Sequence, residues 1–75
     1  MEYTILVHQA EEGGFWSEVP VLPGCYSQGE TIDEALHNAK EAIESYLMAL
    51  KEDLVAAPIE ESLFIGKVKV EVAGL

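Results

Sequence analysis

Hydrophobic and polar residues alternate with a period of two along the first part of the chain. Tyr3, Ile5 and Val7 fall on one side of an extended segment, and this pattern predicts a strand over residues 2–10. The segment 11–14 ends in two glycines, which supply the positive φ of a tight hairpin turn. Two further strands of an antiparallel meander are predicted at residues 15–19 and 24–28.

The length of the hairpin loop decides which side chains of the first two strands share a face. A three-residue loop adds Phe15, Ser17 and Val19 to the side that carries Tyr3, whereas a two-residue loop swaps the two faces. Both arrangements fit the sequence. In the first arrangement the opposite face holds Thr4, Leu6, His8, Trp16 and Glu18.

A helix of about five turns is predicted after the third strand. Thr31 and Glu34 fit the capping box, in which the Thr31 hydroxyl accepts from the N–H of Glu34 and the Glu34 carboxylate accepts from the N–H of Thr31. Ala35 and Ala42 widen an apolar stripe with helical spacing. The stripe itself consists of Ile32, Leu36, Ala39, Ile43, Tyr46, Leu47 and Leu50.

Alternation returns near the end of the chain, where Val68, Val70 and Val72 alternate with charged residues. This pattern predicts a last strand over residues 64–72 with one buried face and one face in water. The element order is therefore β-β-β-α-β. We expect a single α+β domain spanning residues 1–75, in which the helix crosses one face of the sheet and leads into a parallel fourth strand.

One helix covers only one face of such a sheet, so the other face is a candidate surface for a partner protein. A mixture of aromatic, apolar and charged side chains around a large exposed tryptophan is typical of protein interfaces. The candidate partner-binding residues are Leu6, His8, Trp16 and Glu18.

A dense group of turn-forming residues separates the second strand from the helix. Pro20 and Pro23 end strand pairing because neither can donate a backbone hydrogen bond, and Gly24 lets the chain turn. We predict a structural corner here, with Leu22 tucked under it and Cys25 buried. The structural motif consists of Pro20, Leu22, Pro23, Gly24, Cys25, Gly29, Thr31 and Glu34.

The chain carries fourteen acidic residues, four lysines and no arginine, for a net charge of −10. Binding to nucleic acids depends on Lys and Arg at phosphates, so we expect no direct DNA or RNA binding. Excess acid keeps a small protein soluble, and it also attracts a basic partner. A chain of 75 residues with one cysteine has a small core and no internal disulfide, which favours a homo-oligomer, either a dimer or a tetramer.

The sequence contains no secretory signal and no apolar run of membrane-spanning length, and a lone cysteine fits a reducing cytoplasm. Enzyme chemistry is not indicated. The first strand has no central carboxylate for two-metal catalysis, and Glu18 is a lone candidate. The spacing of Cys25 from His8 and His37 does not support a nucleophile with its base, so no metal, cofactor or catalytic residue is predicted.

Residues 11–47 resemble the HicB antitoxin family of bacterial toxin–antitoxin modules, and the resemblance extends from about Tyr3 to Pro58, which is most of the chain. The resemblance is carried by Gly14 before an aromatic residue, by Val19-Pro20 and by Leu22-Pro23-Gly24-Cys25. It continues with Gly29, Thr31, Glu34-Ala35, Ala39 and Ala42. One departure lies at Val21, where the family more often has Asp or Glu.

The resemblance implies a partial ribonuclease-H-like fold and a role in binding and neutralising HicA, a small basic ribonuclease toxin. Many family members carry a further C-terminal DNA-binding segment. This chain ends at Leu75, directly after the last predicted strand, so we expect a short form without that segment. The alternative is an orphan HicB-like oligomeric interaction domain without a toxin partner. A metal-dependent nuclease relic is a third interpretation.

Overall fold

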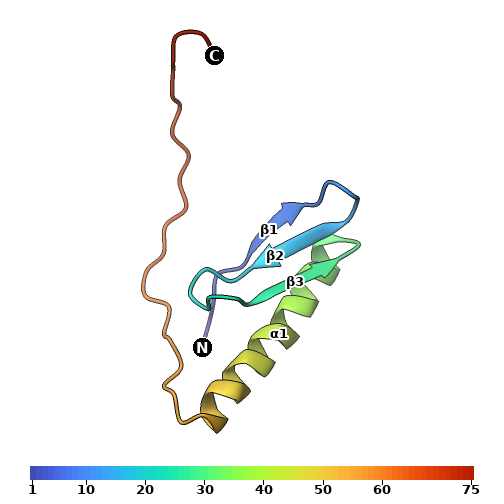
Figure 1. Ribbon diagram of the computed structural model, residues 1–75, viewed down its shortest axis with the longest axis vertical. Helices are drawn as coiled ribbons and strands as arrows, with labels where there is room; N and C mark the ends of the chain where they lie inside the picture. The colour runs from blue at the N-terminus through green and yellow to red at the C-terminus, as the bar shows by residue number, and fades with distance from the viewer.

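The computed structural model describes residues 1–75 as a three-stranded antiparallel sheet with one helix on one of its faces (Figure 1). The strands are β1 (Leu6–Gln9), β2 (Phe15–Glu18) and β3 (Tyr26–Gly29), in the order β1-β2-β3, and the helix is α1 (Ile32–Glu52). The helix lies mainly against β3 and β2. The predicted α+β class, the meander and the helix are confirmed.

The hairpin between β1 and β2 has the three-residue loop. Ala10 and Gly14 close it, with the Ala10 N–H donating to the Gly14 carbonyl over 3.0 Å. Gly13 and Gly14 both have positive φ, at 101° and 72°, which explains the glycines there. Val7 therefore faces Ser17 across the ladder, and Tyr3 and Ile5 pack on the core beside Val19, so the first of the two arrangements left open by the sequence is the one observed.

Residues 19–25 form the predicted corner. The N–H of Leu22 donates to the Val19 carbonyl and the N–H of Cys25 donates to the Leu22 carbonyl, each over 3.0 Å. Gly24 has φ 82°, and the Tyr46 hydroxyl donates to the Pro23 carbonyl over 2.9 Å. The Leu22 side chain is fully buried beside Val19 and Cys25, as predicted.

The start of α1 is fixed by its N-cap. The Thr31 hydroxyl accepts from the Glu34 N–H over 3.0 Å, as predicted, but Glu34 Oε1 accepts from the N–H of Glu30 over 3.3 Å and not from that of Thr31. The carboxylate thus satisfies the donor one residue earlier than a standard capping box does.

Small residues bring α1 close to the sheet. Ala35 and Ala39 are buried against it, and a Cβ on Gly29 would lie only 2.5 Å from the backbone nitrogen of Ala35. Because these alanines face the sheet, Ile32 and Leu36 are turned to the flank, where 51% and 38% of their surface is exposed. Their predicted burial was wrong.

A short polar chain crosses the layer between sheet and helix. The hydroxyls of Ser17 and Ser27 are hydrogen-bonded to each other, and the Ser27 hydroxyl donates to the Ala35 carbonyl over 3.0 Å. Ser17 is completely buried. Every buried side-chain polar atom therefore has a partner.

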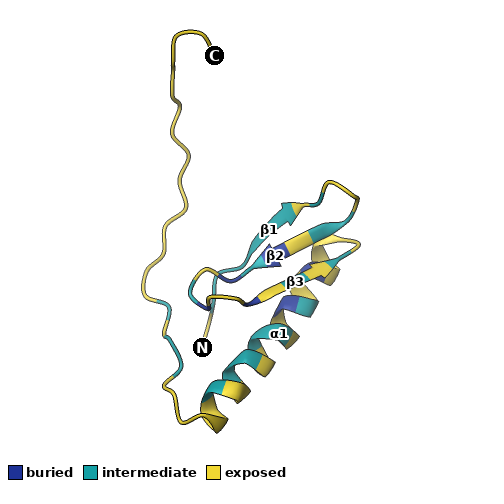
Figure 2. Ribbon diagram, viewed as in Figure 1, coloured by how far each residue is buried: buried dark blue, intermediate teal, exposed yellow.

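The structure does not contain the predicted fourth strand. After α1 the chain turns through Leu54, which has φ 57°, and residues 53–75 form no helix or strand. We call residues 53–75 the tail; Figure 2 shows it exposed for most of its length, leading away from the sheet. Val68, Val70 and Val72 are 84%, 74% and 59% exposed. The prediction was wrong because a strand needs ladder hydrogen bonds from a neighbouring strand, and the alternating segment leads away from the sheet instead of lying along one of its edges (Figure 2).

Candidate partner-binding face

The face of the sheet opposite α1 carries two rows of side chains. Leu6, Glu18 and Tyr26 form one row across the three strands, because Leu6 faces Glu18 and Glu18 faces Tyr26. The second row, aligned in the same way, consists of His8, Trp16 and Gln28. We call these six residues the open face.

Aromatic contacts order the open face. The His8 ring stacks on Trp16 with ring centroids 4.2 Å apart, and Trp16 and Tyr26 lie 6.3 Å apart at a tilted angle. His8 Nε2 also contacts Glu18 Oε2 at 2.7 Å. Trp16 remains 38% exposed and Tyr26 63% exposed. Large aromatic side chains held in place by their neighbours lose little conformational entropy when a partner covers them.

The structure brings together the four residues that the sequence singles out for partner binding, Leu6, His8, Trp16 and Glu18. Two members of the open face, Tyr26 and Gln28, were not predicted. The sequence pattern that could have indicated them is the alternation of residues 25–28. Cys25 and Ser27 point to the helix side of the sheet, so Tyr26 and Gln28 point to the opposite side. Pairing the third strand with the second so that Gln28 faces Trp16 would have placed both residues on the open face.

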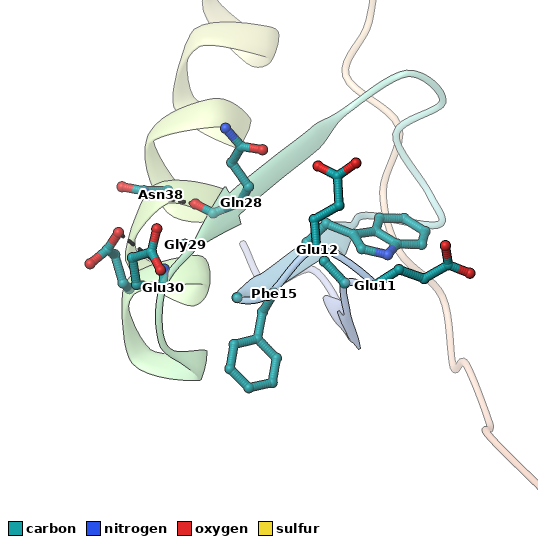
Figure 3. Close-up of a pocket in the computed structure, with 12 residues that line it drawn as sticks. Glu11, Glu12, Phe15, Gln28, Gly29, Glu30 and Asn38 are labelled. Carbon is teal, nitrogen blue, oxygen red and sulfur yellow. Dashed lines mark hydrogen bonds between the residues drawn. The ribbon is translucent and has the colours of Figure 1, made fainter.

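An acidic hollow adjoins the open face at the hairpin end of the sheet. It has a volume of about 590 Å³ and includes Trp16 and Gln28 in its lining. Figure 3 shows Glu11 and Glu12 on the hairpin side and Glu30 on the helix side, with Phe15 between them. Glu34 also lines the hollow and no basic residue does, so positively charged groups are favoured near this end of the open face.

The structural motif forms the scaffold beneath the site. Pro20, Leu22, Pro23, Gly24 and Cys25 make the corner, and Gly29, Thr31 and Glu34 set the approach and the start of α1. None of them belongs to the open face. The corner connects β2, which carries Trp16, to β3, which carries Tyr26.

The candidates for chemistry do not meet in one place. No three His, Cys, Asp or Glu side chains lie close enough together to hold a metal ion. Glu18 contacts His8, whereas His37 lies on the exposed side of α1 and contacts Glu41 at 3.1 Å. Cys25 is buried in the corner, and this burial raises the pKa of its thiol. No helix of the structure is both long and apolar enough for a membrane span.

A family model described as "HicB_like antitoxin of bacterial toxin-antitoxin system" matches residues 3–72. The chain belongs to this HicB-like antitoxin family. The match covers the sheet, the corner, the helix and most of the tail. Residues 53–72 are therefore included in the family match, although they form no strand in the structure.

Several UPF0150 proteins are similar to this chain over most of their length. The UPF0150 protein Ta0767 of Thermoplasma acidophilum is 49% identical over 51 residues, which cover 68% of this chain and 74% of the relative. A UPF0150 protein of Archaeoglobus fulgidus is 39% identical over 72 residues and 96% of each chain. The UPF0150 protein ssr1258 of Synechocystis sp. is 42% identical over 71 residues, or 95% of this chain and 94% of the relative.

Proposed function

We propose that this protein is an antitoxin that binds a small basic ribonuclease toxin of the HicA type and neutralises it by covering its surface. Membership of the HicB-like family supports the toxin–antitoxin role. The observation that carries the proposal is the open face, an ordered aromatic surface that no part of the chain covers, set beside an acidic hollow.

The proposed action is steric and electrostatic. Trp16 and Tyr26 supply the large, well-placed apolar contacts that dominate binding energy in protein interfaces. The net charge of −10 speeds encounter with a positively charged protein and disfavours acidic ones. No group of the antitoxin takes part in catalysis, and no cofactor is needed. We place the complex in the cytoplasm, where the free Cys25 thiol stays reduced.

Co-expression with the product of the adjacent reading frame tests the proposal. We expect the two proteins to copurify and the antitoxin to rescue growth that the partner alone arrests. Tyr26→Ala and Trp16→Ala each weaken binding at least about tenfold, because truncated aromatic hot spots cost 2 kcal/mol or more. Met48→Ala is the matched control, since the exposure of Met48, 56%, lies between those of Trp16 and Tyr26 but the residue lies on α1, away from the open face.

The outcomes separate the remaining interpretations. Failure to bind the neighbouring product would favour an interaction domain without a toxin partner. Equal losses from Met48→Ala and Tyr26→Ala would place the interface elsewhere. The purified protein is expected to leave RNA intact with or without Mg²⁺, and cleavage that disappears in Glu18→Gln would instead support a nuclease.

A further inference from the structure

Glu18 differs from the other acidic residues of the chain in its burial and its hydrogen bonds. Every acidic residue is exposed except Glu18 and Glu60, which are half-buried. Glu60 uses both carboxylate oxygens on Thr4, accepting from its N–H over 2.6 Å and from its hydroxyl over 2.8 Å. Glu18 Oε2 contacts His8 Nε2 at 2.7 Å, whereas Glu18 Oε1 accepts no hydrogen bond from the protein. Glu18 is therefore the one half-buried carboxylate with an oxygen free for another molecule.

Glu18 also lies in the middle strand of the open face. It faces Leu6 on one neighbouring strand and Tyr26 on the other, and Trp16 points to the same side from two residues before it. No other residue of the open face is acidic, and no lysine of the chain contacts Glu18. A partner that covers the open face therefore takes water away from a carboxylate that has no lysine or arginine of its own chain to pair with.

The contact with His8 fixes the orientation of this carboxylate. The His8 ring stacks on Trp16 with ring centroids 4.2 Å apart and 19° between the ring planes, so the imidazole that holds Glu18 is itself held. Only 33% of the Glu18 side chain is exposed. A carboxylate that is already oriented loses little conformational entropy when it binds.

A carboxylate covered in this way requires a cation from the partner. Leaving it without one would bury an uncompensated charge, which costs far more than an apolar mismatch. The surroundings favour arginine over lysine, because a guanidinium is planar, stacks on aromatic rings and is more weakly hydrated than an ammonium group. Trp16 and Tyr26, with ring centroids 6.3 Å apart, are the aromatic side chains beside Glu18 that such a group would contact.

We propose that Glu18 selects the partner of the open face by accepting a hydrogen bond at its free oxygen from an arginine side chain that packs against Trp16 and Tyr26. The arginine belongs to the basic partner of the proposed function, on which this inference rests. His8 is a positioning residue, which acts by holding the Glu18 carboxylate. A protein without an arginine at this point leaves Glu18 buried and unpaired, so the open face discriminates against it.

The first test measures binding of the product of the adjacent reading frame to Glu18→Gln, which keeps the shape of the side chain and removes its charge. We expect the dissociation constant to rise about 30-fold or more, mainly through faster dissociation, because the partner's arginine is left unpaired. The matched control is Glu41→Gln. Glu41 also contacts a histidine, His37 at 3.1 Å, but it is 67% exposed on α1.

The two variants lose the same charge, so they separate a local contact from long-range attraction. Glu41→Gln is expected to raise the dissociation constant less than about threefold, through slower association. This small effect should vanish in about 0.5 M salt, whereas most of the loss in Glu18→Gln should remain, because salt screens exposed charges more than covered ones. Urea denaturation checks that both variants are folded.

A double-mutant cycle identifies the group that Glu18 contacts. Each arginine and each lysine of the partner is changed to Ala, and binding is measured to the wild type and to Glu18→Gln. We expect one arginine whose removal weakens binding to the wild type at least about tenfold more than binding to Glu18→Gln. Coupling of Glu18 to a lysine, or to no basic residue at all, would overturn the proposal.

His8→Phe tests the positioning role, because Phe keeps a ring to stack on Trp16 but has no Nε2. It is expected to weaken binding about fivefold in the wild-type chain and hardly at all in the Glu18→Gln chain. Equal losses in the two chains would overturn this role. A wild type that does not bind would refute the proposed function together with this inference, whereas equal losses from Glu18→Gln and Glu41→Gln would overturn this inference alone.

Discussion

The corner at residues 19–25 and the tail at residues 53–75 are both rich in apolar residues, yet one is the centre of the core and the other is in water. In the corner, successive backbone hydrogen bonds fold the chain upon itself and bury Leu22. In the tail, the hydrogen bonds to the rest of the chain end at Glu60, and the valines that follow are exposed. The difference teaches that apolar residues are buried where local geometry or a neighbouring strand holds them.

The substitution expected to have the largest effect on stability is Leu22→Ala, in the corner. Removing a fully buried side chain from the corner is expected to lower the free energy of unfolding by about 3 kcal/mol, since it deletes apolar contacts and leaves a cavity. Leu54→Ala, at a side chain that is 94% exposed, is expected to change it by less than about 0.5 kcal/mol. Urea denaturation measures both, and similar losses at the two sites would remove the contrast.

The next largest loss of stability is expected for Gly29→Ala. Its Cβ would meet the backbone of α1 at 2.5 Å, and backbone atoms cannot move aside as the end of a side chain can. We expect a loss of about 2 kcal/mol in thermal or urea unfolding. At Gly66, in the tail, an added Cβ meets nothing within 4 Å, so Gly66→Ala is the control and should leave stability nearly unchanged.

The rate at which a thiol reagent modifies a cysteine can be compared between the corner, which contains Cys25, and the tail. Burial raises the pKa of the Cys25 thiol, so less thiolate forms at pH 8, and a thiol reagent should modify it at least about tenfold more slowly than an exposed cysteine. A chain with Cys25→Ser and Ser62→Cys supplies the tail cysteine for comparison. Equal rates at the two positions in native protein would show that the corner opens readily.

The same shift predicts the effect of pH on stability. A raised pKa in the folded state means that folding favours the neutral thiol, so this contribution is complete below the pKa of the unfolded thiol. It is lost as the pH rises toward and through the higher folded pKa. Urea denaturation of the wild type and of Cys25→Ser across alkaline pH isolates this contribution, and no difference in their pH dependence would contradict it.

The smallest effect is expected at the N-cap. Thr31→Ala removes the acceptor for the Glu34 N–H and should cost about 1 kcal/mol of unfolding free energy. Thr31→Ser keeps the hydroxyl and should restore most of it. Ser62→Ala removes a hydroxyl from the tail, where no element begins, and a comparable loss there would refute the capping explanation.

Much of the structure of the sheet, the corner and the helix could be predicted from local sequence patterns. The cap at Thr31, the corner around Leu22 and the alternation of Tyr3, Ile5 and Val7 each depend on neighbours within a few residues, so the sequence alone was enough to place them. The side of the sheet that carries His8 and Trp16 then followed once the loop length was known, because each strand has a two-residue period.

What the sequence could not decide depends on distant partners. Leu36 has perfect helical spacing, but its exposure is set by how closely Ala35 approaches Gly29. The valines of the tail have perfect strand spacing, but forming a strand requires an edge at the right distance. Tyr26 joined the open face only through its alignment with Glu18 across the ladder.

The buried hydroxyls of Ser17 and Ser27 help to fix the register of β3 against β2. Sliding β3 along β2 by two residues would keep the same side chains facing the helix, yet it would separate the two hydroxyls and leave Ser17 without a partner in a place that water does not reach. Such an isolated dipole costs more than a mispacked methyl group. Two small polar side chains thus destabilise a shifted register in which apolar side chains would still be buried.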